Sequence, residues 1–247
     1  MRVVALSGSE IISNAELIMN NIGQIVNVIC QNPSNPKFNH YVFETVALLI
    51  RFIPGTDITY LHKFEEMLSP QFISILQNQV AEFTPYVLQL MSQLMELSPN
   101  GAIPPSYISV LPPLLQPSPW ENHGNIPALV RLMETYIIKI PDHIVSSNQL
   151  PSFLGICQKL VTSRMNDHFG FEMLHLIFDS IPLNVLEPYL VNVFGMLVGR
   201  LSSNKTVKFT RGFLKFLCVL FIKNKPGLDI SRIISVFNTM QAGYFLK

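Results

Sequence analysis

The segment from Phe38 to Asp57 reads FNHYVFETVALLIRFIPGTD, a helical pattern that ends at Pro54. Proline ends such a run because it lacks the amide donor and biases the residue before it away from helix. Four later segments follow the same plan, and the five prolines lie 45, 42, 41 and 44 residues apart: Pro54, Pro99, Pro141, Pro182 and Pro226. A period of this size is typical of stacked helical repeats. The pattern therefore predicts an α-solenoid.

Aligned on these prolines, the five segments are apolar at matching positions. Four residues before the proline stand Ile50, Met95, Ile137, Phe178 and Ile222. Five residues before it stand Leu49, Leu94, Tyr136, Ile177 and Phe221, and eight before it Val46, Met91, Met133, Leu174 and Cys218. Steps of three and four residues keep side chains on one face of a helix. We therefore expect these residues to form the core.

A second stripe, at 14, 10, 7 and 3 residues before the proline, is mostly polar in the first four segments. It consists of His40, Glu44, Ala47, Arg51; Pro85, Gln89, Ser92, Glu96; Pro127, Arg131, Glu134, Ile138; and His168, Glu172, His175, Asp179. The rest of each helix is mostly apolar, so the helix must be covered on several sides, as the inner helix of a stacked repeat is. The fifth segment drifts by about one residue and carries Lys208, Arg211 and Lys215 in this stripe.

The predicted fold is all-α: a right-handed HEAT-repeat solenoid of antiparallel helical hairpins, forming a single array over residues 1–247. The inner helices are predicted at 38–53, 84–97, 125–140, 167–181 and 206–223. The other helices are predicted at 14–31, 57–68, 71–80, 107–115, 150–163 and 185–201. The first of them is expected to stop at Asn32–Pro33, and Pro70 is expected to open the helix at 71–80.

The two ends of the chain fall inside this repeat pattern. Met1 to Leu6 reads as the tail of a helix, and Asp229 is expected to cap a last helix. The apolar residues of that helix have no following partner: Ile230, Ile233, Ile234, Phe237 and Met240. Because solenoids need polar capping repeats, we expect a piece of a longer solenoid that self-associates through its exposed ends.

Composition argues against several classes of partner. Hydrophobic residues make up 49% and charged residues 13% of the chain, against about 25% charged in ordinary domains. The longest apolar run, Phe213 to Ile222, contains Lys215 and is shorter than the ~20 residues that span a bilayer. A net charge of +1 gives no reason to expect nucleic acid as a partner. We therefore expect neither membrane insertion nor nucleic-acid binding.

The sharpest candidate for chemistry is the stripe His168, Glu172, His175 and Asp179, which contains a Glu-x-x-His. Di-iron bundles use this spacing, but they need a second copy and two further glutamates, which this sequence lacks. The three cysteines (Cys30, Cys157 and Cys218) are too few and scattered for a disulfide framework or a Cys-rich zinc site. Phosphate-binding glycine loops and nucleophile elbows are also missing. We therefore predict no enzyme, no metal and no cofactor, with a helical metal enzyme as a remote alternative.

Two features could serve partner binding. Trp120, the only tryptophan, lies among prolines and a glycine and could anchor a partner, although an indole packed over a loop is the favoured interpretation. Five basic residues fall within sixteen positions: Arg200, Lys205, Lys208, Arg211 and Lys215. No acidic residue lies between Gly199 and Gly227. The cluster is either a solvated helix face, which is favoured, or a docking patch for an acidic protein surface.

Several words of this sequence occur together in one family. They are NPKFNHYVFE (35–44), LLQPSPWE (114–121), GNIPALVRL (124–132), NDHFGF (166–171) and NKTVKF (204–209). In this order they resemble the importin-alpha re-exporters, the cellular apoptosis susceptibility type of exportin in the karyopherin-beta superfamily. The resemblance runs from about Asn32 to Ile222.

This resemblance implies a HEAT-repeat superhelix that binds importin-alpha together with Ran in its GTP state and returns importin-alpha to the cytoplasm. It also implies residence in both nucleus and cytoplasm, and a central-to-C-terminal position of this segment within the family protein. GTP hydrolysis belongs to Ran, so no catalysis is expected of this chain. The alternative is a generic HEAT or armadillo-type scaffold for some other protein, which the periodicity fits equally well.

Overall fold

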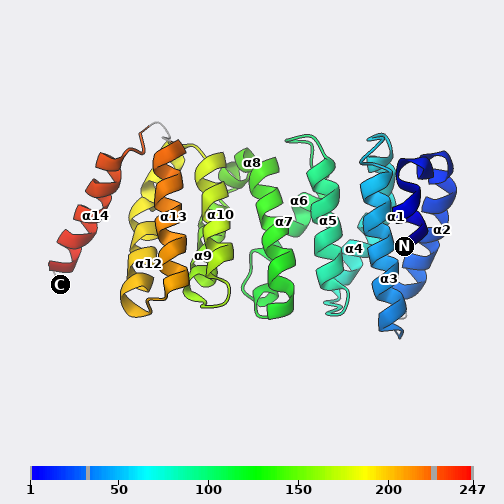
Figure 1. Cartoon of the computed structure of the whole chain (residues 1–247), viewed down its shortest axis with the longest axis horizontal. Coiled ribbons are helices and arrows are strands. Elements are labelled where there is room, and N and C mark those ends of the chain that lie inside the picture. The colour runs from blue at the N-terminus through cyan, green and yellow to red at the C-terminus, as the bar shows by residue number, and fades with distance from the viewer. Residues whose placement is uncertain (1, 32–33, 224–226, 246–247) are drawn as a thin grey trace. The chain divides into compact units, whose positions relative to one another are not determined.

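The computed structural model describes residues 2–31, 34–223 and 227–245, and every regular element in these ranges is a helix (Figure 1). Two of the positions where a helix was predicted to end, Pro33 and Pro226, lie outside the described residues. The side chain of Met240 also lies outside them. The chain forms two compact units, Met1–Thr135 and Tyr136–Lys247, and the boundary between their residue ranges falls within helix α7 (Ile126–Lys139).

The first unit begins with α1 (Arg2–Ser7) and a 3-10 turn (Gly8–Asn14), followed by α2 (Ala15–Gln31) and α3 (Pro36–Phe52). The chain continues through α4 (Tyr60–Gln77), α5 (Thr84–Leu97), α6 (Pro105–Leu114), the short 3-10 turns Ser118–Trp120 and His123–Asn125, and α7. Helices α2 and α3 form one hairpin and α4 and α5 the next, with α2 against α4 and α3 against α5 (Figure 1). This is the stacking of two helical repeats.

The second unit repeats the arrangement. It contains α8 (Pro141–Ser146), α9 (Leu150–Thr162), α10 (Asp167–Ser180), α11 (Leu183–Leu186), a 3-10 turn (Glu187–Tyr189), α12 (Leu190–Ser203), α13 (Val207–Lys223) and α14 (Ile230–Phe245). Helix α9 pairs with α10 and α12 with α13, while α10 packs on α13 and α12 packs on both α9 and α14.

The five predicted inner helices are present as α3, α5, α7, α10 and α13, each within two residues of its predicted bounds. Ile50, Met95 and Ile137 are fully buried, as predicted from the proline alignment. The residue before the proline leaves the helical conformation at Ser98 (ψ 145°) and Ile181 (ψ 132°). This is the steric effect that proline exerts on its predecessor, whereas Ile53 before Pro54 stays helical (ψ −72°). The burial of the aligned apolar residues therefore confirms the repeat assignment for the first four segments.

The predicted register of the fifth helix is wrong. Ile222 is 81% exposed and Cys218 is exposed, whereas Phe216 and Leu220 are buried. These two buried residues stand 42 positions after Leu174 and Phe178. The true repeat length at α13 is therefore 42 and not 44, because the chain runs two residues further before Pro226.

Two other helices differ from their predictions because of proline. Pro70 does not open a new helix: it lies inside α4, on an exposed side where the Glu66 carbonyl can turn to solvent. Conversely, the helix predicted at 185–201 is interrupted by the 3-10 turn around Pro188, and α12 begins only at Leu190.

The last helix, α14, is capped as predicted, but two of its apolar side chains that were expected to lack a partner pack against other residues. The Asp229 carboxylate accepts a hydrogen bond from the Arg232 amide at 2.7 Å. Ile233 is 2% exposed, and the Phe237 ring meets that of Phe194 with centroids 5.4 Å apart. The expectation that these two side chains lack a partner is therefore wrong, and it holds only for Ile230 and Ile234, which are 57% and 52% exposed.

Candidate partner-binding surface

Within each unit, the predicted polar stripe links neighbouring inner helices. Arg131 of α7 forms two parallel hydrogen bonds of 2.8 Å with the Glu96 carboxylate of α5. Gln93 of α5 donates to the Ala47 carbonyl of α3 at 2.9 Å. The paired Glu96 carboxylate raises the pKa of Arg131. Glu96 and Arg131 of the stripe therefore bond to each other between helices and are not free for a partner.

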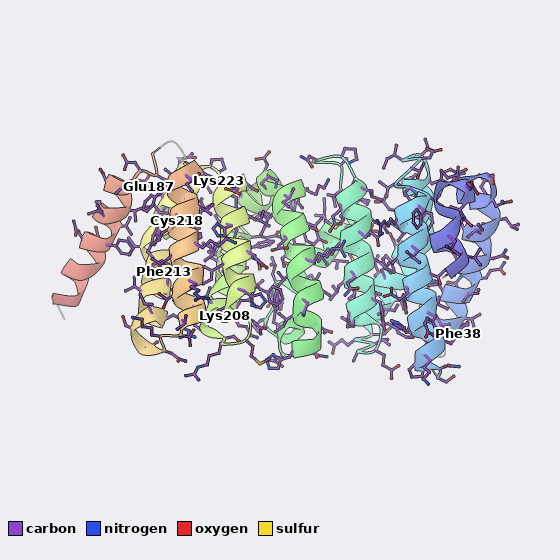
Figure 2. All side chains as sticks on the ribbon, in the orientation of Figure 1. Phe38, Glu187, Lys208, Phe213, Cys218 and Lys223 are labelled. Carbon is purple, nitrogen blue, oxygen red and sulfur yellow. The ribbon has the colours of Figure 1, made fainter. Side chains whose placement is uncertain are left out.

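Lys208 of α13 also forms an ion pair with a neighbouring inner helix, α10. Its ammonium lies 2.9 Å from Oδ1 of Asp167, whose side chain is almost completely buried at the start of α10. It also lies 3.2 Å from the Met165 carbonyl and 3.2 Å from the His168 ring. Figure 2 shows Lys208 and Lys223 at opposite ends of α13, and Lys223 pairs with Asp179 of α10. Sequence reasoning missed this second pair, for which the only signal is the opposite charge one repeat apart.

Arg200 does not lie on an exposed surface. It is 4% exposed at the end of α12, and its guanidinium carbon lies 5.0 Å from the centre of the Phe209 ring. Its three side-chain nitrogens have no hydrogen-bond partner among the described residues. A cation over an aromatic face gains part of the energy that desolvation costs it, so Arg200 acts on the packing of α12 against α13.

The remaining members of the predicted basic cluster are exposed. Lys205 lies in the turn before α13, and Arg211 and Lys215 lie one helical turn apart on it. In the described part of the chain these three side chains form no ion pair. We define the basic patch as Lys205, Lys208, Arg211 and Lys215, in which Lys208 is partly neutralised by Asp167.

The Glu-x-x-His stripe forms no metal centre in the structure. Burial lowers the pKa of His175, whose Nδ1 has no hydrogen-bond partner among the described residues. The His175 ring meets Phe216 edge-on at 5.0 Å, and Asp179 is occupied by Lys223. Across the described ranges, no group of three His, Cys, Asp or Glu side chains could hold a metal ion.

Trp120 packs over a loop, which is the favoured of its two interpretations. Its ring is 2% exposed, and its indole N–H donates to the Leu114 carbonyl at 2.8 Å. A buried, hydrogen-bonded indole cannot anchor a partner without the loop opening. Among the described helices none is both long and apolar enough to cross a membrane.

The comparison with known proteins decides the family. The family model described as "CAS/CSE protein, C-terminus" matches residues 1–247. The chain belongs to the CAS/CSE family. The structure of a CAS/CSE member, "The exportin Cse1 in its cargo-free, cytoplasmic state", superimposes on this chain with a TM-score of 0.84 at 30% identity. The match covers 99% of this chain and 25% of that one, and the HEAT-repeat solenoid fold is thereby confirmed.

Curated CAS/CSE relatives are named as transport receptors. The importin-alpha re-exporter of Schizosaccharomyces pombe is 36% identical over 245 residues, covering 99% of this chain and 25% of the relative. Exportin-2 of Homo sapiens is 40% identical over 225 residues (90% and 23%), and Exportin-2 of Oreochromis niloticus is 44% identical over 207 residues (82% and 21%). The chain spans about a quarter of the length of the CAS/CSE proteins that it matches.

Proposed function

We propose that this chain serves as a segment of a nuclear export receptor that binds importin-alpha together with Ran in its GTP state. In this role it would return importin-alpha to the cytoplasm and move between nucleus and cytoplasm. The observation that carries the proposal is the match of 99% of the chain, at 36% identity, to a protein named importin-alpha re-exporter. The proposed mechanism is protein binding by stacked helices, without catalysis or a cofactor.

The basic patch on α13 is our proposed contact with an acidic surface of one of these partners. Arg211 and Lys215 support this assignment because they are exposed, lie on neighbouring helical turns and form no ion pair among the described residues. Charges of this kind mainly speed the encounter of two proteins and make it sensitive to salt. Arg200 has no part in this contact, since it is buried.

A replacement experiment tests the receptor function. This chain is substituted for the matching segment of the Schizosaccharomyces pombe re-exporter, and binding of importin-alpha is measured with and without Ran loaded with GTP. We expect binding that depends on Ran-GTP, as in the unsubstituted re-exporter. A folded chimera that binds importin-alpha equally well without Ran-GTP, or not at all, would favour the generic scaffold instead.

A charge reversal in the same chimera tests the basic patch separately. We expect Arg211→Glu with Lys215→Glu to slow association at low salt by about tenfold, with the difference shrinking as salt is added. The control is Lys37→Glu with Arg51→Glu, which changes net charge equally at two other exposed positions. Lys208 is left intact, because a carboxylate beside buried Asp167 would destabilise the fold. Equal association rates for the two double variants would remove the patch from the interface.

A further inference from the structure

The turn that joins α5 to α6 contains the only Asn-Gly pair of the 247-residue sequence, Asn100–Gly101. An asparagine side chain can be attacked by the backbone nitrogen of the next residue, which closes a five-membered ring. Glycine in that next position hinders the attack least, because it has no side chain. The chain can therefore react with itself at this pair, provided that the turn leaves both groups free.

The geometry of the turn leaves the attacking nitrogen free. The Ala102 amide donates to the Pro99 carbonyl at 3.1 Å, and Gly101 has a φ of +80°. The φ of Asn100 is not positive, so residues 99–102 form a type II turn, whose third residue requires positive φ. The hydrogen bond of such a turn uses the amide of the fourth residue. The Gly101 N–H donates to no acceptor among the described residues.

The side chain of Asn100 is free as well. Residues 99–102 are all exposed, and the Asn100 carboxamide has no hydrogen-bond partner in the described part of the chain. Nothing lies within 4 Å of a Cβ placed on Gly101. The peptide group between the two residues can therefore rotate, so that its nitrogen approaches Cγ of Asn100 without meeting a neighbouring helix.

The helices on both sides of the turn are anchored independently of it. The Ser98 amide donates to the carbonyls of Leu94 and Met95, both at 3.2 Å, and the Ser98 side chain is buried. On the other side of the turn, Ile103 is 7% exposed. These anchors confine the change to residues 99–102, so the reaction does not require α5 or α6 to unfold locally.

Other exposed asparagines lack this combination of features. Asn122 also lies in a loop, but its Oδ1 accepts a hydrogen bond from the Gly124 amide at 3.0 Å, which holds the carboxamide in place. Asn238 is exposed in α14, where the amide that follows it is used by the helix. Asn100 should therefore react before either of them.

We propose that Asn100 is a self-modification site, at which the folded protein converts asparagine to aspartate and isoaspartate. The Gly101 nitrogen loses its proton to hydroxide and bonds to Cγ of Asn100. The Cγ–Nδ2 bond breaks, and the leaving nitrogen takes a proton from water and departs as ammonia. Water then opens the ring at one of its two carbonyl carbons. Water and hydroxide are the only co-reactants, and no group is oxidised or reduced.

The two products differ in which bond of the Gly101 nitrogen breaks. Loss of its new bond to Cγ leaves aspartate, whereas loss of its bond to the backbone carbonyl carbon of Asn100 leaves isoaspartate. Either product adds a negative charge near the carboxyl end of α5, where the helix dipole disfavours it. Isoaspartate also lengthens the backbone of the turn by one carbon atom. The modification therefore changes both the charge and the length of the connection between α5 and α6.

Incubation of the 247-residue chain at pH 8, followed by digestion and mass spectrometry, tests this proposal. We expect Asn100 to be hydrolysed before any other asparagine, and its peptide to separate into two products of equal mass. Isoaspartate is identified by enzymatic carboxyl methylation with labelled S-adenosylmethionine, since this product alone has a free α-carboxylate within the chain. The reaction should be faster at pH 9 than at pH 7, because hydroxide removes the Gly101 proton.

Two variants with the same chemical change locate the site. Asn100→Gln should lose the methyl label, because its longer side chain would have to close a less favourable six-membered ring. Asn238→Gln, at an exposed position of α14, should incorporate as much label as the chain without substitutions. Circular dichroism before and after incubation confirms that each chain stays folded. An unchanged Asn100, earlier hydrolysis of another asparagine, or undiminished labelling of Asn100→Gln would each overturn the proposal.

Discussion

Gly170 of α10 lies tightly against Val161 of α9. A Cβ at this position would lie 2.6 Å from Cγ2 of Val161 and 2.9 Å from the Val161 backbone nitrogen. A backbone atom cannot rotate away as a side chain can, so the two helices would have to separate. Position 170 therefore requires glycine for packing and not for a turn.

We predict that Gly170→Ala lowers the free energy of unfolding by about 1–3 kcal/mol, the usual cost of overpacking a core. Gly155→Ala in α9 is the matched control, because nothing lies within 4 Å of its added Cβ. The control should be neutral or stabilising by up to about 1 kcal/mol, since alanine favours helix over glycine. Urea denaturation of both variants provides the measurement, and equal midpoints would contradict the packing argument.

The three cysteines should differ sharply in reactivity. Burial raises the pKa of the fully buried Cys157 thiol far above its usual range, and raises that of half-buried Cys30 to about 11. Since the thiolate is the reactive form, a raised pKa lowers the reactive fraction at any pH below it. Cys218 lies on α13 (Figure 2) and is exposed.

Alkylation with iodoacetamide at pH 8, followed by mass spectrometry, should therefore modify Cys218 first, Cys30 more slowly and Cys157 only after unfolding. Raising the pH from 8 to 9 should speed modification of Cys30 about tenfold, because its thiolate fraction grows tenfold per pH unit while the pH stays well below its pKa. Rapid labelling of Cys157 in the native chain would show that α9 is not packed as described.

At the scale of the helix, the core side of α13 is set by its aromatic residues. The Phe216 ring lies 5.5 Å from that of Phe178, at 88°, and 6.4 Å from that of Phe194. Phe171 contributes a further ring, 5.3 Å from Phe209. Aromatic pairs at such distances add to the energy of burial. These ring contacts determine which side of α13 faces the core, which the position of the following proline does not.

A pair of alanine substitutions two residues apart tests this rotation. Leu220→Ala should cost about 2–5 kcal/mol of stability, as deletion of a buried leucine does. Ile222→Ala should stay within about 0.5 kcal/mol, the range of surface substitutions, because Ile222 is 81% exposed. The proline alignment predicts the reverse order. Thermal unfolding of the two variants distinguishes the two registers.

The helices were predictable where a local signal decides them. The inner helices carry an apolar stripe, and α5 and α10 end where proline forces its predecessor into an extended conformation, so their bounds follow from nearby residues. Pro70 and Pro188 show the limit of this rule, since proline can open, interrupt or lie within a helix according to which side is exposed. The register of α13 was predicted wrongly because the alignment used the distance to the next proline. Packing against α10, which the alignment does not contain, decides which residues of α13 are buried.

The candidate surface was less predictable, because it depends on pairs that lie about one repeat apart. The cluster of basic residues was visible in the sequence, but the ion pairs of Lys208 with Asp167 and of Lys223 with Asp179 join residues 41 and 44 positions apart. The burial of Arg200 likewise requires knowledge of the Phe209 ring beside it. Charge along a sequence therefore overstates the charge that a folded surface presents.

At the scale of the whole molecule, each unit is a stack in which every hairpin contacts its neighbours. In the second unit, α10 packs on α13, and α12 packs on α9 and α14. Stability in such arrays is approximately a sum over hairpins and the interfaces between them. A helix face without a neighbour consequently stays exposed, and the second unit has one on α13, where Val207, Leu214 and Ile222 are 71%, 56% and 81% exposed.

We predict that the 247-residue chain self-associates through this face of α13. Leu214 and Ile222 stand eight residues apart, about two helical turns, and so lie on one side of the helix. Burial of a large apolar side chain gains about 1.5–3 kcal/mol, whereas association costs at least about 4 kcal/mol in lost freedom. Two such side chains on each of two copies exceed that cost only modestly, and Arg211 and Lys215 on the same side of α13 repel their counterparts in the second copy. The complex should therefore be weak, concentration-dependent and favoured by salt, which screens this repulsion. Light scattering over a dilution series should show the mean mass rising with concentration.

Two double variants test whether this face of α13 is responsible. Leu214→Glu with Ile222→Glu should keep the chain monomeric. Asn192→Glu with Asn238→Glu, which adds the same charge at exposed polar positions, should not. A constant monomer mass for the unmodified chain at every concentration would show that α13 does not associate.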